Sequence, residues 1–112
     1  MRIENKVAVI TGAGSGIGLA TARLFIEQGA KVVAADWNEE AVTSAAKEIG
    51  GSIVPVRADV ADEADCAAMI DRAVSEFGRI DVLVNNAGVM DLFQSVADMD
   101  NDMWRRCMSV NV

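Results

Sequence analysis

The chain has 112 residues, a length that fits one domain with a single hydrophobic core. Its 52% hydrophobic and 24% charged residues are typical of a globular protein and exclude a disordered or fibrous one. The net charge is −7 and the basic residues are scattered, which argues against a nucleic-acid partner. No apolar run reaches the roughly 20 residues of a membrane helix and no secretory signal is visible, so we expect a cytoplasmic protein without membrane contact.

Short β-branched runs alternate with longer helical patterns along the chain. Strands are predicted over residues 6–11, 31–36, 53–57 and 81–85, and helices over 17–28, 39–49 and 63–77, with a further helix from 98. We expect Asn38 and Asp62 to cap the second and third helices, which Gly50 and Gly78 then end. The helical spacing aligns Ile17, Ala20, Leu24 and Gln28 along one side of the first helix and Ala41, Ala45 and Ile49 along one side of the second. It predicts that the inner face of the third helix consists of Ala67, Ile70, Val74 and Phe77.

The predicted strands are apolar without alternation, as parallel strands covered by helices on both faces are. Right-handed crossovers between such strands build an open sheet with helices on both sides. The sequence therefore predicts an α/β fold: a three-layer, doubly wound parallel sheet of the Rossmann type, with four strands in the order 3-2-1-4. No linker or second domain is visible in residues 1–112.

The segment TGAGSGIG joins the first predicted strand to the first helix. Glycines at such a turn let the backbone approach a ligand closely, and the N–H groups of the first helical turn point toward an anion. The fingerprint GxGxxG fails because Ile17 or Leu19 stands at the third glycine, and a P-loop fails because no Gly-Lys-Ser/Thr follows. The pattern that fits is GxxxGxG, at Gly12, Gly16 and Gly18.

Two other interpretations of this loop remain open. Glycine-rich turns also occur as plain helix caps. The GxGxG pattern of S-adenosylmethionine-dependent methyltransferases also matches, at Gly14, Gly16 and Gly18, although those proteins usually carry an acidic residue where this chain has Ile10 and Thr11.

Asp36 ends the second predicted strand, where a carboxylate accepts hydrogen bonds from the hydroxyls of an adenosine ribose. The same carboxylate would repel a 2′-phosphate. Neither Ser15 nor Trp37 supplies the basic group that a phosphate requires, so the sequence favours NAD over NADP.

With the Asp59-Val60 pair after the third strand and NNAG at residues 85–88 after the fourth, the chain resembles the short-chain dehydrogenase/reductase family. The four motifs stand in family order and the resemblance covers the whole chain. It implies an NAD-dependent oxidoreductase that transfers hydride between nicotinamide and a small alcohol or carbonyl compound. By this resemblance Asp59 and Val60 would hold the adenine, and Asn86 would brace the crevice between strands one and four.

The resemblance also implies that Ser15 and Ile17 contact the pyrophosphate, and that the segment after Asn86 lies beside the nicotinamide ribose. No metal ligand is expected, because the sequence has no histidine and no metal-type spacing. The predicted cofactor-binding set is Gly12, Ser15, Gly16, Ile17, Gly18, Asp36, Trp37, Asp59, Val60, Asn86, Ala87 and Gly88.

Family members use an Asn-Ser-Tyr-Lys catalytic set, of which only Asn111 has a match in this sequence. The serine and the YxxxK segment would come later, and the chain contains no tyrosine. We therefore expect residues 1–112 to be the N-terminal, cofactor-binding part of one Rossmann-like domain, inactive alone. A catalytically inert dinucleotide-binding or regulatory module is the alternative.

An incomplete sheet would leave the fourth strand, with Val82, Leu83 and Val84, at an exposed edge. Such an edge pairs readily with another chain, so we expect a homo-oligomer or self-association. Cys66 and Cys107 lie in helix-like stretches and are expected to be small buried apolar residues.

Overall fold

The computed structural model describes residues 3–86. Every element predicted within that range is present, with bounds that differ by one residue at most. The helix predicted from residue 98 lies outside the described residues. In chain order the elements are β1 (Val7–Thr11), α1 (Gly16–Glu27), β2 (Lys31–Asp36), α2 (Glu39–Ile49), β3 (Ile53–Arg57), α3 (Glu63–Phe77) and β4 (Val82–Asn85).

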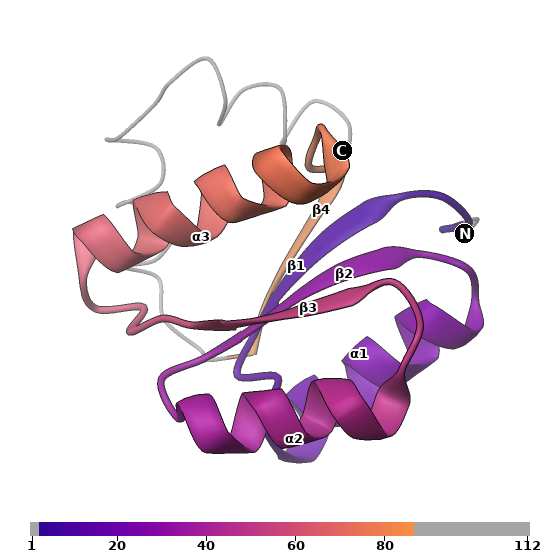
Figure 1. The fold of residues 1–112 in the computed structure, drawn as a ribbon, viewed down its shortest axis with the longest axis horizontal. Coiled ribbons are helices and arrows are strands. Elements are labelled where there is room, and N and C mark those ends of the chain that lie inside the picture. Colours follow the sequence, from indigo (N-terminus) through magenta and orange to yellow (C-terminus); the bar gives the residue numbers. More distant parts are fainter. Residues whose placement is uncertain (1–2, 87–112) are drawn as a thin grey trace.

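The strands form one parallel sheet in the order β3-β2-β1-β4, which confirms the predicted fold class. Helices α1 and α2 cover one face of this sheet and α3 covers the other (Figure 1). Val9 of β1 stands in register with Val33 of β2 on one side and with Leu83 of β4 on the other. Because all strands run the same way, the loops that follow them gather at one edge of the sheet.

The sheet carries a separate hydrophobic core on each face. Side chains alternate along each strand, so Val9 and Val33 pack toward α3, while Ile10 and Val32 pack toward α1 and α2. All four of these side chains are fully buried. This is why the interior positions of the strands are apolar on both faces of the sheet.

Two of the three helices begin and end as the sequence predicts. The side chain of Asn38 accepts a hydrogen bond from the Ala41 amide at 3.0 Å, and that of Asp62 from the Asp65 amide at 3.1 Å. The helices end at Gly50 and Gly78, whose φ angles are 68° and 84°. Only glycine adopts such angles readily.

The side of α1 that carries Ile17 and Leu24 is not the side that faces the sheet. Ile17 is 77% exposed and Leu24 is 51% exposed, while the buried residues are Gly18 and Ala22. The spacing of large side chains does not mark the buried side, because α1 approaches the sheet through two small residues, four positions apart.

The other two helices needed smaller corrections. In α3, Val74 is 36% exposed rather than buried. In α2, Ala45 is buried as expected, but Ala41 and Ile49 are only half-buried. The buried sides consist of Cys66, Met69, Ile70 and Ala73 in α3 and of Val42, Ala45 and Ala46 in α2.

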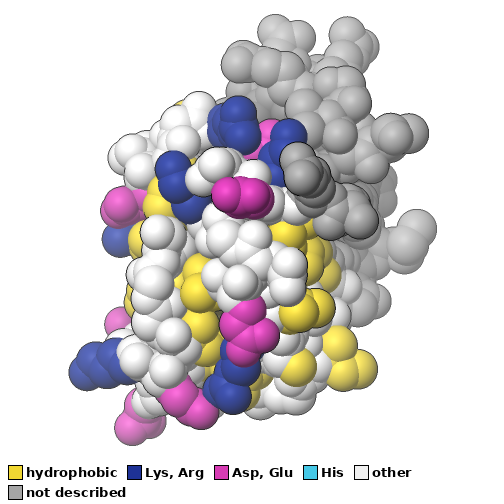
Figure 2. All heavy atoms as spheres, turned by 90° about the vertical axis from the view of Figure 1, so that its right-hand side faces the viewer, with side chains coloured by type: hydrophobic (Ala, Val, Ile, Leu, Met, Phe, Trp, Pro, Cys, Tyr) yellow, Lys and Arg dark blue, Asp and Glu magenta, His cyan; other side chains and the backbone are white. Residues whose placement is uncertain are grey.

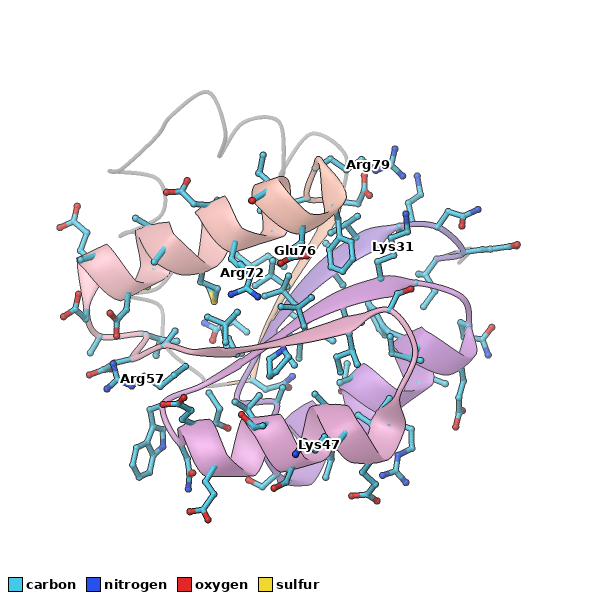
Figure 3. All side chains as sticks on the ribbon, in the orientation of Figure 1. Lys31, Lys47, Arg57, Arg72, Glu76 and Arg79 are labelled. Atoms are coloured by element: carbon cyan, nitrogen blue, oxygen red, sulfur yellow. The ribbon has the colours of Figure 1, made fainter. Side chains whose placement is uncertain are left out.

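A buried carboxylate fastens the starts of β1 and β4. Asp81 is 4% exposed, and its Oδ2 accepts a hydrogen bond from the Val7 amide at 2.9 Å. The same oxygen pairs with Arg79 Nε at 2.8 Å, and the guanidinium also donates to the Asn5 carbonyl. Figure 3 labels Arg79 at the end of α3 that leads into β4, and Arg57 at the opposite end. Asp81 therefore satisfies a backbone donor that the sheet itself leaves unpaired.

The charged surface mixes both signs. On the face near the start of β1, acidic side chains lie between the basic ones, with hydrophobic side chains among them (Figure 2). Within residues 3–86, no helix combines the length and apolar character needed to cross a membrane.

We expect Asp81→Ala to lower the free energy of unfolding by about 1–3 kcal/mol, because the Val7 amide would stay buried without an acceptor. The exposed Asp71→Ala on α3 serves as a matched control and should change it by less than about 0.5 kcal/mol. Urea unfolding followed by circular dichroism measures both. Equal effects of the two substitutions would show that the Asp81 contact contributes nothing.

Candidate functional site

A cleft of about 680 Å³ lies where the strands end. Residues at or just after the C-terminal end of each of the four strands line it. Parallel α/β sheets bind their ligands at this edge. The lining residues are Gly12, Ser15, Ile17, Gly18, Asp36, Trp37, Asn38, Ala41, Val60 and Asn86.

The segment of residues 12–18, here called the glycine loop, lines one side of the cleft. Gly12 and Gly16 have φ angles of 64° and 58°, which lie in the left-handed region that favours glycine. Gly18 is required for a different reason: a Cβ there would lie 1.9 Å from the Gly12 carbonyl oxygen. The first turn of α1 therefore rests directly on the loop that leaves β1.

The N-terminus of α1 differs from those of α2 and α3. Ser15 occupies the N-cap position but its side chain makes no capping hydrogen bond, and the first turn contains no acidic residue. The other two helices have both a capping side chain and acids in the first turn. The backbone N–H groups and the positive end of the α1 dipole thus remain available to an anion in the cleft.

The Asp36 carboxylate is held by two backbone amides at the end of β2. Its Oδ2 accepts from the Gly14 amide at 2.9 Å, and its Oδ1 accepts from the Asn38 amide at 3.1 Å. Trp37, the next residue, is 71% exposed and lines the same cleft.

Polar side chains also join β1 to β4 at this edge of the sheet. Thr11 Oγ1 donates to Asn85 Oδ1 at 3.0 Å. The side-chain nitrogen of Asn86 is buried and finds no hydrogen-bond acceptor in the part of the chain that the structure describes. Asn86 lines the cleft, so a ligand bound there could accept a hydrogen bond from this buried amide nitrogen.

The turn after β3 forms the side of the cleft at Val60, and hydrogen bonds of Asp59 hold this turn. Asp59 Oδ1 accepts from the Ala61 amide at 2.9 Å, and the Asp59 amide donates to Asp65 Oδ2 at 2.9 Å. Val60 lines the cleft, whereas Asp59 stands beside it.

The structure thus brings eight of the predicted cofactor residues together around one cleft, with Gly16 next to them at the start of α1. Ala87, Gly88 and Asn111 lie outside the described residues. Asn38 and Ala41 also line the cleft but were not predicted. Their position next to Asp36, in the first turn of α2, was the only signal in the sequence.

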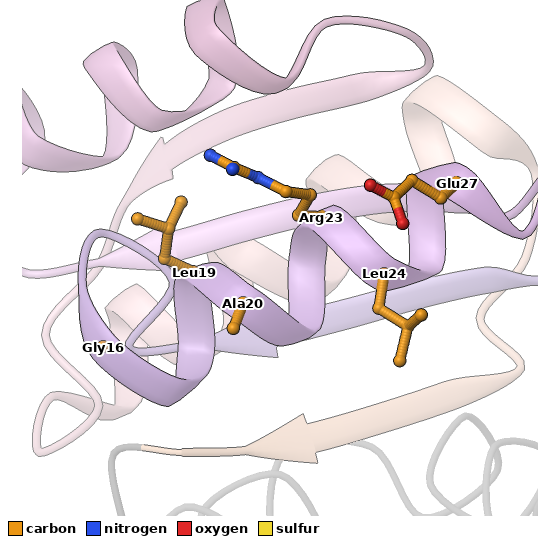
Figure 4. A pocket seen from close by; sticks show the side chains of 6 residues that line it. All are labelled: Gly16, Leu19, Ala20, Arg23, Leu24 and Glu27. Carbon is orange, nitrogen blue, oxygen red and sulfur yellow. The ribbon is translucent and has the colours of Figure 1, made fainter.

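A second hollow, of about 260 Å³, runs along the outer side of α1 (Figure 4). Arg23 and Glu27 lie beside Leu19 and Leu24 there, and Arg23 forms an ion pair with Glu48 of α2 at 2.8 Å. Of the predicted site residues that lie within 3–86, only Gly16 lines this hollow, so the cleft is the better candidate. Among residues 3–86, no group of three or more potential ligands could hold a metal ion.

Cys66 is fully buried and forms no disulfide, as expected for a small apolar core residue. Its Sγ donates to the Val60 carbonyl at 3.4 Å, behind the cleft wall. Burial raises the pKa of the Cys66 thiol, and the negative charge of Asp65 and other nearby acids raises it further. Cys107 lies outside the described residues.

The family profile described as short chain dehydrogenase matches residues 6–112. The chain belongs to the short-chain dehydrogenase family. It is 44% identical to 3beta-hydroxysteroid dehydrogenase 2 of Eggerthella lenta, over 98% of this chain and 44% of that protein. It is 46% identical to meso-2,3-butanediol dehydrogenase of Serratia marcescens, over 100% of this chain and 45% of that protein.

Solved structures of family members have the same fold. A 3-ketoacyl-(acyl-carrier-protein) reductase from Brucella melitensis, complexed with NADH, superposes with a TM-score of 0.71 at 36% identity, over 96% of this chain and 48% of that one. A hydroxysteroid dehydrogenase from Escherichia coli gives 0.80 at 32% identity, over 87% and 51%. The chain therefore spans about half the length of these relatives, and matches the N-terminal part of the family.

The raised pKa of Cys66 predicts that stability falls at alkaline pH. Below the ordinary thiol pKa both states are protonated; as the pH rises from that value toward the folded-state pKa, only the unfolded state loses its proton and gains stability. We expect unfolding in urea to become easier between about pH 7.5 and about pH 9.5. The loss should be larger in a Cys107→Ser chain than in the same chain carrying Cys66→Ala. Identical pH dependences would contradict this.

Proposed function

We propose that this chain is the cofactor-binding part of an NAD-dependent oxidoreductase that transfers hydride between nicotinamide and a small alcohol or carbonyl compound. The observation that carries the proposal is the pairing of two features in one cleft. The uncapped N-terminus of α1 suits a pyrophosphate, and the Asp36 carboxylate suits a ribose.

The residues of the cleft fit such a dinucleotide from end to end. Gly12, Ser15, Gly16, Ile17 and Gly18 hold the pyrophosphate, largely through backbone N–H groups. The adenosine end lies over the β2 side of the cleft, with its ribose on the carboxylate. The residues that bind this end are Asp36, Trp37, Asp59 and Val60.

Asn86 holds the nicotinamide end of the cofactor through its buried amide, with Ala87 and Gly88 beside the ribose. Its buried Nδ2 without an acceptor among the described residues supports this assignment. When bound, the nicotinamide ring supplies the hydride acceptor or donor. In the complete protein, Asn111 belongs to the catalytic set.

Asp36 selects NAD over NADP. Its charge repels a 2′-phosphate, and none of the residues between 3 and 86 that line the cleft is basic. The basic residue in register with it on β3 is Arg57, whose guanidinium pairs instead with Asp65 at 2.9 Å. A phosphate on the ribose would therefore meet the Asp36 carboxylate without an offsetting cation from the described lining of the cleft.

The 112 residues by themselves are proposed to bind cofactor without catalysing turnover. They contain no tyrosine and no histidine, so the usual groups for proton transfer to a substrate oxygen are missing. As it stands, the chain is better described as a dinucleotide-binding module. The methyltransferase alternative is not retained, since the relatives are named as dehydrogenases and reductases.

Calorimetry should show that the chain binds NAD at least about tenfold more tightly than NADP or S-adenosylmethionine, with no NADH oxidation on added carbonyl compounds. Asp36→Ala should weaken NAD binding about 10- to 100-fold, because a hydrogen-bonded charge is lost. Asp71→Ala, on the far helix α3, should leave it unchanged. Equal affinity for NAD and NADP would contradict the proposed specificity.

We also propose that the isolated chain self-associates through β4. Among the described residues β4 pairs only with β1, so its other side forms an edge of the sheet. Val82, Leu83 and Val84 are only half-buried along it. Light scattering should show dimers or larger species. Leu24→Lys, which alters the exposed side of α1 and not the edge, should leave them intact. A monodisperse, stable monomer would refute the proposal.

A further inference from the structure

The glycine loop contains four glycines, and two different constraints act on them: backbone angles at Gly12 and Gly16, and lack of space for a Cβ at Gly14 and Gly18. Gly12 and Gly16 need glycine for their backbone angles. Gly14 does not, because its φ lies outside the left-handed region and its backbone would accept alanine. What alanine would lack at Gly14 is space: its Cβ would lie 2.8 Å from Asp36 Oδ2 and 3.0 Å from the Ala41 Cβ.

The space above Gly14 is taken by the carboxylate that faces the cleft. The Gly14 amide donates to Oδ2 of Asp36 and the Asn38 amide donates to Oδ1, at 2.9 and 3.1 Å. These donors come from the two segments on either side of the carboxylate, so they fix its plane as well as its position. Each carboxylate oxygen accepts about two hydrogen bonds, which leaves one direction on each for a ligand.

We propose that Gly14 is a positioning residue for ribose recognition. Its N–H and its missing side chain hold the Asp36 carboxylate in the orientation that accepts hydrogen bonds from two adjacent ribose hydroxyls. Gly14 thereby contributes to the preference for an unphosphorylated ribose. This inference rests on the proposed function, since it assigns the way in which the same cleft recognises its ligand.

The contacts separate this role from a purely structural one. At Gly18 a Cβ would meet backbone, which cannot move without displacing α1. At Gly14 the nearest atom is the end of an aspartate side chain, which can rotate away. Alanine at Gly14 should therefore leave the fold intact while it turns the carboxylate away from the ribose.

The test is a double-mutant cycle on the full 112-residue chain, with calorimetric Kd values for NAD and NADP. We expect Gly14→Ala to weaken NAD binding about tenfold, which is about 1.4 kcal/mol, and to change NADP binding less than about twofold. In an Asp36→Ala background the same substitution should change NAD binding less than about twofold, because the group through which it acts is gone. Circular dichroism during heating reports whether each variant is folded.

Two further variants keep the inference testable if Gly14→Ala disturbs the fold. Asp36→Glu keeps the charge but moves the carboxylate off the two amides, so NAD affinity should fall nearly as far as in Asp36→Ala. Gly14→Ala combined with Ala41→Gly relieves the contact with α2 but not the contact with Asp36, so NAD affinity should stay low.

Distinct outcomes would overturn the inference and the proposed function. NAD binding that Gly14→Ala leaves unchanged, or that Ala41→Gly restores, overturns the role of Gly14 alone. Full NAD affinity in Asp36→Glu would likewise overturn the role of Gly14 alone. Failure of the unsubstituted chain to bind NAD overturns the proposed function, and the role of Gly14 with it.

Discussion

The close approach of Gly18 to the Gly12 carbonyl is the contact on which the site depends. A Cβ at Gly18 would lie 1.9 Å from that oxygen, so α1 can begin where it does only if this residue is glycine. The contact sets the first turn of α1 against the end of β1, beside the carboxylate that ends β2. The shape of the cleft, and the position of the first-turn N–H groups of α1 beside it, follow from this placement.

Much of the fold could be predicted because its signals are local. Strands whose interior is apolar without alternation indicate a covered parallel sheet, and Asn38 and Asp62 mark helix starts through their own hydrogen bonds. The buried side of α1 could not be predicted, because Gly18 and Ala22 bring the helix close to the sheet while Leu24 stays exposed. The contact of Asp81 with the Val7 amide was also invisible, since it joins positions far apart in sequence.

The candidate site was predictable to the extent that residue types carry its chemistry. Glycines at fixed spacing and an acid at the end of β2 are such residue types, and the structure brings them to one cleft. The amides of Asn38 and Gly14 that hold Asp36 are backbone groups, which every residue except proline possesses, so residue type does not mark these hydrogen bonds in the sequence. Ala41 reaches the cleft only because α2 packs beside the loop.

The central claim is that a dinucleotide binds across the N-terminus of α1 at the edge of the sheet. Hydrogen–deuterium exchange of the chain, with and without saturating NAD, tests it most directly. NAD should slow amide exchange in residues 15–18 and around Asp36. Exchange in residues 23–27, which lie along the second hollow on the outer side of α1, should not change. Protection from exchange that is confined to this second hollow, or no protection at the glycine loop while NAD is bound, would contradict the claim.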